Sequence, residues 1–88
     1  MATSQLHFAY ILYSHDIDAF YIGATSGPVE QRLYKHLNKH RGFTARAEDW
    51  IIVHVEQFET LQEARARERQ IKNWKSKTMI RKLIEPGE

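Results

Sequence analysis

One carboxylate stands alone in the most basic part of the chain. Residues 65–82 contain eight Lys or Arg residues and a single acid, Glu68. On a helix that begins at Leu61, a rotation of about 100° per residue places Glu68 on the same side as Ala64 and Ile71. That side is expected to face the core. Because an unpaired buried charge is very costly, Glu68 requires a partner.

Two kinds of partner satisfy this requirement. In the first, an arginine such as Arg32 forms an ion pair with Glu68, and the pair is structural. In the second, Glu68 binds a divalent cation, since Mg²⁺ is commonly held by one or two protein carboxylates while substrate phosphates and water fill its other positions. Ion-pair networks are the commoner of the two, so the carboxylate alone does not decide between them.

Other residues whose side chains could take part in catalysis occur earlier in the chain. Tyr10 and Tyr21 lie in two β-rich apolar runs, and Arg32 and His36 are four residues apart on one side of a predicted helix, at the rim of the core. Taken singly, tyrosines in such runs are usually packing residues, and a histidine is usually a surface residue. Their significance depends on whether the fold brings them close to Glu68.

The first part of the chain predicts a β-hairpin. The runs "HFAYILYS" (7–14) and "FYIG" (20–23) are separated by a turn of about five residues, and Gly23 is expected to end the second strand. Because side chains alternate along a strand, Tyr10 is expected on the same face as the apolar residues two positions before and after it.

A helix and a third strand follow the hairpin. Capping signals and the spacing of apolar residues predict a helix over Pro28–Lys39. The segment 50–58 is predicted to be a strand with Ile51, Val53 and Val55 on one face.

Two further helices complete the chain. Thr60 and Glu63 match the capping box, in which each side chain bonds the backbone N–H of the other at a helix start. The helix that follows is predicted to end at Trp74 or Lys75, and Ser76 can begin a last helix.

These elements predict an α/β (α+β) fold in one domain over residues 1–88. Their order is β-β-α-β-α-α, and a three-stranded antiparallel sheet flanked by helices is the simplest architecture. With 42% hydrophobic residues and no cysteine, the chain is expected to be globular, without disulfides or a thiolate metal site, and a thiol nucleophile is excluded. We expect a soluble, cytoplasmic protein, because the first apolar run lacks a basic leader and is too short to span a membrane.

Charge is segregated along the chain, although the net charge is only +2. Residues 32–46 carry five bases and no acid, whereas residues 48–63 carry five acids and no base. If the two basic segments meet in the fold, they form a face suited to polyanions, and a solvated surface without a partner is the alternative. Trp50 and Trp74 are expected to pack rather than to stack on bases. The candidate phosphate contacts are Lys35, Lys39, Arg41, Arg46, Lys72, Lys75 and Lys77.

The candidate site residues follow a recognisable order along the predicted elements. They are Tyr10, Tyr21, Gly23, Arg32, His36 and Glu68. The motifs "YIG" and "RLYKH" and the string "EARARERQIKNW" (63–74) resemble the GIY-YIG nuclease superfamily, in particular its small stand-alone members. The superfamily includes the nuclease module at the start of a bacterial DNA-repair excinuclease. The resemblance runs from Phe8 to Ile84.

The first motif of the superfamily is only partly present. The positions of its Gly and Ile are taken by Phe8 and Ala9, and the tyrosine matches as Tyr10. The two replaced positions are packing positions, so the departure leaves the polar groups in place. Gly23, in the intact second motif, is implied to be structural.

The resemblance implies metal-dependent hydrolysis of DNA phosphodiester bonds, with Mg²⁺ or Mn²⁺ as the cofactor. It implies that Glu68 is the metal ligand and that Arg32 clamps the phosphate in the transition state. Tyr10 is implied to activate water, which requires nearby positive charge because an ordinary phenol, with a pKa of about 10, is a poor base at neutral pH. Tyr21 would hydrogen-bond the water or the phosphate, and His36 would orient Tyr10 or share its proton.

We therefore predict a divalent-metal-dependent endonuclease that cuts DNA, with RNA left open as a substrate. Because 88 residues leave no room for a separate recognition domain, it is expected to be selective for nucleic-acid structure or directed by a partner. Two alternatives stay open. One is a non-catalytic nucleic-acid-binding module of the same fold, and the other is a small interaction protein in which Glu68 and Arg32 form a buried pair.

Overall fold

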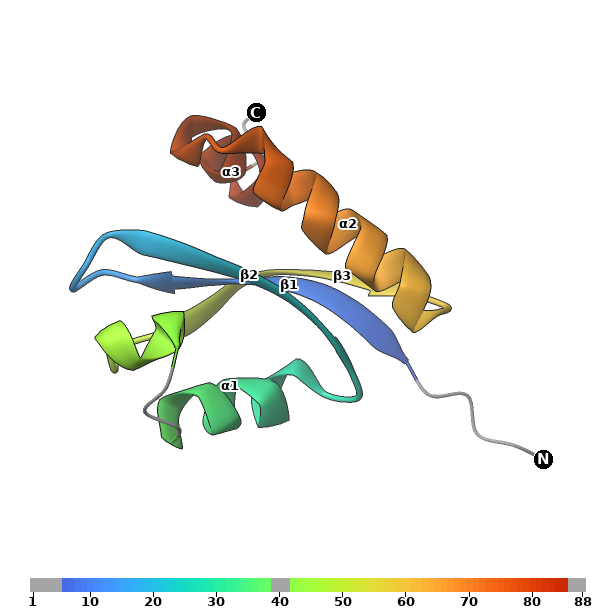
Figure 1. Ribbon diagram of the computed structural model, residues 1–88, viewed down its shortest axis with the longest axis horizontal. Helices are drawn as coiled ribbons and strands as arrows, with labels where there is room; N and C mark the ends of the chain where they lie inside the picture. The colour runs from blue at the N-terminus through green and yellow to red at the C-terminus, as the bar shows by residue number, and fades with distance from the viewer. Residues whose placement is uncertain (1–5, 39–41, 86–88) are drawn as a thin grey trace.

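The computed structural model of the chain describes residues 6–38 and 42–85, which form a sheet of three antiparallel strands with helices on both faces (Figure 1). The order of the strands in the sheet is β2-β1-β3, so β1 is central. The predicted order β-β-α-β-α-α is confirmed, with one short 3-10 helix, η1, added before the third strand. The elements are β1 (His7–Ser14), β2 (Ala19–Ser26), α1 (Val29–Asn38), η1 (Phe43–Arg46), β3 (Ile51–Phe58), α2 (Leu61–Trp74) and α3 (Lys77–Ile84).

The central strand contributes to a separate apolar cluster on each face of the sheet. Tyr10 and Leu12 pack with Trp50 on the side of α1 and η1, as the alternation along β1 predicts. Ile11 packs with Ile71 on the side of α2 and α3. Figure 1 shows the two layers of helices separated by the sheet. Trp50 is buried within the first cluster and Trp74 packs against the second, so the prediction that both tryptophans pack is confirmed.

The tip of the hairpin is tied to the last helix. Its turn has four residues rather than the predicted five, and it ends at Asp18, which has a φ of 49°. The carboxylate of Asp18 accepts hydrogen bonds from the hydroxyl of Tyr13 at 2.7 Å and from Arg81 of α3 at 2.9 Å. The bonds from Tyr13 and Lys77 hold the pKa of Asp18 below its ordinary value. These bonds fix α3 relative to β2.

The third strand contains a β-bulge. Leu12 pairs with Ile52, whereas Ile11, its neighbour in β1, pairs with His54, so Val53 is an extra residue in β3. Because side chains alternate across a sheet, one extra residue moves every later side chain of the strand to the other face.

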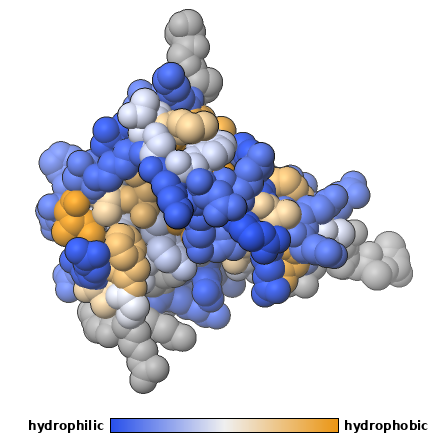
Figure 2. Space-filling view, turned by 45° about the horizontal axis from the view of Figure 1, so that its top comes forward, coloured by the Kyte–Doolittle hydropathy of each residue, from blue (hydrophilic) through white to orange (hydrophobic). Residues whose placement is uncertain are grey.

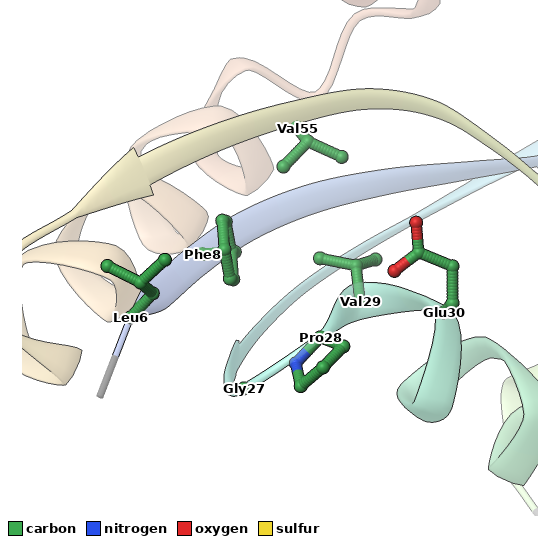
Figure 3. A pocket seen from close by; sticks show the side chains of 7 residues that line it. All are labelled: Leu6, Phe8, Gly27, Pro28, Val29, Glu30 and Val55. Carbon is green, nitrogen blue, oxygen red and sulfur yellow. The ribbon is translucent and has the colours of Figure 1, made fainter. Parts of the chain in front are cut away.

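The predicted common face of Ile51, Val53 and Val55 is therefore wrong for Val55. Val53 packs in the cluster on the side of α2. Val55 instead points into an apolar cavity of about 510 Å³ on the side of α1, beside Phe8 and Val29 (Figure 3). The bulge is the reason for the difference.

Helices α2 and α3 begin at the predicted capping residues. The hydroxyl of Thr60 accepts a hydrogen bond from the backbone N–H of Glu63 at 3.1 Å, and that of Ser76 accepts one from Met79 at 3.2 Å. Helix α2 ends before Lys75, which adopts the left-handed conformation with a φ of 52°. The first helix also agrees with its prediction to within one residue at each end.

The outer surface of the helices on one side is mostly hydrophilic. Figure 2, turned to bring forward the side on which α2 and α3 lie, shows a polar surface with separated apolar patches. Within residues 6–38 and 42–85, no helix has the length and apolar character needed to cross a membrane.

Candidate active site

The ring of Tyr10 lies across Gly23. The two residues are direct partners in the pairing of β1 with β2. A Cβ atom added to Gly23 would lie 2.5 Å from the phenol oxygen of Tyr10 and 2.6 Å from its Cζ atom. The absence of a side chain therefore lets the tip of the tyrosine reach the outer strand of the sheet. Strand β2 continues to Ser26, so the expectation that Gly23 ends the strand is wrong.

A second tyrosine and an arginine lie at the same place. The ring centroids of Tyr10 and Tyr21 are 6.4 Å apart, and the ring planes are tilted by 41°. Arg32, on the exposed side of α1, hydrogen-bonds the hydroxyl of Tyr10. Two phenols and one guanidinium, from β1, β2 and α1, thus meet at the edge of the sheet.

The hydroxyl of Tyr10 is held in its neutral form. Burial, which leaves only 1% of the residue exposed, raises the pKa of Tyr10 to about 12. The hydrogen bond from Arg32 and its positive charge act in the opposite direction, whereas Tyr21 and Glu68 raise the pKa further. The effect of Glu68 means that its carboxylate lies within electrostatic range of the phenol.

Glu68 lies on α2 between two buried residues, Ala64 and Ile71, as the helical spacing predicts. Its side chain is 21% exposed, so it lies at the edge of the core rather than within it. Its ion-pair partner is Lys72, one turn later, at 2.7 Å. Among the described residues, Glu68 forms no ion pair with Arg32, so the interpretation that these two residues form a buried structural pair is wrong.

A metal ion at Glu68 would have to share its coordination with a substrate, because the described residues offer it a single carboxylate. Residues 6–38 and 42–85 contain no group of three His, Cys, Asp or Glu residues able to enclose a metal. Mg²⁺ does not require one, because it commonly keeps several waters and binds one or two carboxylates together with substrate phosphates. The ammonium group of Lys72 lies 2.7 Å from this carboxylate, so a metal ion bound here would have to displace it.

The predicted phosphate contacts within the described residues are distributed over four elements, including α3, which begins at Lys77, a residue that contacts Asp18. Lys35 is exposed on α1, and Lys72 and Lys75 are exposed at the end of α2. Arg46 is exposed on η1. The predicted contacts Lys39 and Arg41, and the side chain of His36, lie outside the part of the chain that the structure describes.

One aromatic residue beside the site was not predicted. Phe43 of η1 is 39% exposed, although its ring lies 6.4 Å from that of Tyr21 and 5.8 Å from that of Trp50. The guanidinium of Arg46 lies over the same ring at 5.1 Å. The signal in the sequence was an aromatic residue within the basic loop "KHRGFTAR".

The apolar cavity shown in Figure 3 does not belong to this site. Its lining includes Leu6, Phe8 and Pro28 but none of the predicted site residues. Among the described residues, the only ionisable one in its lining is Glu30, which Figure 3 shows at its margin. The polar groups able to do chemistry therefore lie elsewhere on the sheet.

The fold and the cluster define a small α+β domain that carries two tyrosines, an arginine and a glutamate at one edge of its sheet. The model of the GIY-YIG catalytic domain matches residues 6–82, so the chain belongs to the GIY-YIG family. No significant match was found among curated proteins or among solved structures. Members of this family are generally endonucleases that act on DNA and depend on divalent metal ions, and family membership supports a nuclease-type function for this chain.

The contact between Tyr10 and Gly23 leads to a prediction about stability. Gly23→Ala is expected to lower the unfolding free energy by about 1–3 kcal/mol, because the new methyl group overlaps the ring of Tyr10. In a Tyr10→Ala background the same methyl group has room, so the cost is expected to be at least about 1 kcal/mol smaller. Urea denaturation of the four proteins measures this coupling. An equal cost of Gly23→Ala in both backgrounds would contradict the geometry.

The raised pKa of Tyr10 predicts a loss of stability at alkaline pH. Between about pH 10 and pH 12 the phenol ionises in the unfolded chain but stays neutral in the folded one, so folding becomes less favourable as the pH rises. The expected loss is up to about 3 kcal/mol relative to a Tyr10→Phe variant, which cannot ionise there. The test is to measure the unfolding free energies of both proteins across this pH range. If the two free energies fall equally with pH, the folded protein does not raise the pKa of Tyr10.

Proposed function

We propose that this chain is a divalent-metal-dependent endonuclease that hydrolyses phosphodiester bonds of DNA and is selective for nucleic-acid structure or directed by a partner. The observation that carries the proposal is the gathering of Tyr10, Tyr21, Arg32 and Glu68 around the outer strand of the sheet, in a chain of the GIY-YIG family. These groups come from β1, β2, α1 and α2, so only the folded chain brings them together.

Glu68 is the residue proposed to hold the metal. A bound Mg²⁺ or Mn²⁺ ion supplies positive charge that neutralises the phosphate oxygens as the bond breaks. Arg32 is proposed to clamp the phosphate, because its planar guanidinium donates two parallel hydrogen bonds to phosphate oxygens. The exposure of Arg32 on α1 leaves it accessible to a polyanion.

Tyr10 is proposed to accept a proton from the attacking water. Since burial raises its pKa, positive charge at the site is necessary for the phenolate to form, and Arg32 supplies part of it through its hydrogen bond. Tyr21, whose ring lies 6.4 Å away, is proposed to hydrogen-bond the water or the phosphate. His36 is proposed to orient Tyr10 or to share its proton.

The exposed bases are proposed to bind the phosphates on either side of the cut. Lys35 and Arg46 lie on the side of α1, and Lys72 and Lys75 lie at the end of α2. Because such contacts release counterions, affinity for DNA is expected to fall as the salt concentration rises. Lys39 and Arg41 are proposed to belong to the same set.

The first test separates the metal ligand from a structural role. Glu68→Gln is expected to lower metal-dependent cleavage of DNA at least about 100-fold, because the amide loses the charge that attracts the ion. Stability is expected to change by less than about 1 kcal/mol, because the ion pair with Lys72 is partly exposed. The measurements are cleavage of labelled single-stranded, duplex and branched DNA in Mg²⁺, Mn²⁺ or chelator, and thermal unfolding.

The matched control for this test is Glu63→Gln, on the exposed first turn of the same helix. It is expected to cleave as the parent chain does. Cleavage that survives in chelator or in Glu68→Gln would refute the metal site. DNA binding without cleavage under any ion would instead support a non-catalytic binding module.

The second test concerns the proton acceptor. In the range from about pH 6 to pH 9, below the pKa of Tyr10, kcat/KM is expected to rise up to about tenfold per pH unit as the fraction of phenolate increases. Tyr10→Phe keeps the ring but removes the acceptor, and is expected to lower kcat/KM about 100-fold or more and to remove the rise. Tyr13→Phe, a tyrosine of the same strand away from the cluster, is the control. A rise with pH that persists in Tyr10→Phe would assign the proton to another group.

A further inference from the structure

A groove of about 340 Å³ lies beside β2, between η1 and the junction of α2 and α3. Its apolar lining includes Ile22, Ile71 and the ring of Phe43. Three lysines line the same groove, and they are Lys72, Lys75 and Lys77. An apolar surface bordered by cations is suited to a ligand that combines a flat ring with negative charge.

The backbone holds Phe43 in place at one wall of this groove. Gly42, directly before it, has a φ of 70° and a ψ of −162°, a conformation essentially restricted to glycine. The indole N–H of Trp50 donates a hydrogen bond to the backbone oxygen of Thr44 at 3.0 Å, and Thr44 is buried. The short helix η1 is thereby tied to the core, so the position of Phe43 is fixed.

The ring of Phe43 contacts Trp50 and Tyr21. The guanidinium of Arg46 lies over the same ring at 5.1 Å, so a base that stacks on this ring takes the place of Arg46. Trp50, which it contacts, is 2% exposed, whereas Phe43 is 39% exposed. Its plane lies within 19° of that of Tyr21. Rigid aromatic rings of this kind are the platforms on which unpaired nucleobases stack.

The groove also contains a cation without an ion-pair partner among the described residues. Lys72 is paired with Glu68, and Lys77 contacts Asp18. Lys75 is exposed, and no carboxylate of the described residues pairs with it. Its left-handed backbone ends α2 at the groove, so its ammonium group is available to a phosphate.

The groove adjoins the proposed active site at two points. Phe43 neighbours Tyr21 with ring centroids 6.4 Å apart, and Lys72 contacts the carboxylate of Glu68 at 2.7 Å. A nucleotide in the groove is therefore next to the place where the phosphate is proposed to be cut.

We infer that this groove binds one unpaired nucleotide of a DNA strand, with its base stacked on Phe43 and its phosphate on Lys75. The inference rests on the proposed nuclease function and specifies its substrate. In a duplex, both faces of each base are covered by its neighbours, so only an unpaired base presents a face to the ring. The substrate class is therefore DNA with at least one unpaired nucleotide beside the cleaved bond.

The experiment measures binding in chelator, where a metal-dependent enzyme does not cut. Fluorescence anisotropy gives the affinity for three labelled DNAs of one sequence, namely a single strand, a perfect duplex and a duplex with an internal unpaired segment. The unpaired position carries 2-aminopurine, whose fluorescence falls when it stacks. The variants are Phe43→Leu, which keeps apolar packing but loses the flat ring, Phe43→Trp, which keeps a ring, and Lys75→Ala.

Matched controls come from outside the groove. Tyr34→Leu removes an aromatic ring that is 68% exposed on α1, and Lys82→Ala removes an exposed lysine on α3. Thermal unfolding of every variant establishes that it is folded.

Phe43→Leu is expected to weaken binding of the single strand and of the duplex with the unpaired segment about tenfold or more and to abolish the change in 2-aminopurine fluorescence, while Phe43→Trp retains both. Binding of the perfect duplex is expected to change less than about twofold. Lys75→Ala is expected to weaken binding of the unpaired DNAs and to reduce its salt dependence. Tyr34→Leu and Lys82→Ala are expected to bind as the parent chain does.

Equal losses for single-stranded and duplex DNA in Phe43→Leu, or no loss, would overturn the inference. The outcome is separable from that of the nuclease proposal. If Phe43→Leu loses stacking but the parent chain cuts no DNA, the nucleotide-binding groove is supported and the nuclease proposal is rejected. If the parent chain cuts DNA and Phe43→Leu cuts all three DNAs as well as the parent chain does, the groove is rejected and the nuclease proposal is supported.

Discussion

The passage of the Tyr10 ring over Gly23 is the contact on which the site depends. Tyr10 belongs to the central strand and is buried, so its hydroxyl reaches the margin of the sheet only because its partner on β2 lacks a side chain. The helices that carry Arg32 and Glu68 lie on opposite faces of the sheet (Figure 1). The edge of the sheet is where groups from both faces can approach one hydroxyl, and the missing Cβ atom brings the hydroxyl there.

Opposing electrostatic effects act on that hydroxyl. Burial and the carboxylate of Glu68 favour the neutral phenol, whereas the guanidinium of Arg32 favours the phenolate. Glu68, the lone acid of the basic segment, is therefore electrostatically coupled to the hydroxyl of Tyr10. Its ion-pair partner is the ammonium group of Lys72, and the pair is partly exposed to solvent. A cation that replaced this ammonium group would change the protonation balance at Tyr10, and this electrostatic coupling would connect the proposed metal on α2 with the proposed proton acceptor on β1.

The sequence predicted those features that depend on residues close together in the chain. Thr60 and Ser76 start helices through bonds to residues three positions later, so their roles are visible in a short segment. The bulge at Val53 depends on how β3 pairs with a strand about forty residues earlier, which local alternation does not encode. Phe43 was missed for the same reason, because its importance comes from Tyr21, Trp50 and the lysines of α2, all distant in sequence.

The two positions at which the first motif is incomplete, Phe8 and Ala9, are packing positions. Phe8 packs against the cluster on the side of α1, and Ala9 is buried in the central strand, so neither side chain reaches the edge of the sheet. Substitutions at these positions alter packing, which a volume-conserving change elsewhere in the core can compensate. Tyr10 is the one residue of the three whose side chain carries a polar atom, and that atom lies buried against Gly23 at the edge of the sheet. In this chain the close contact between Tyr10 and Gly23 therefore tolerates less change of side-chain size than the packing positions of Phe8 and Ala9.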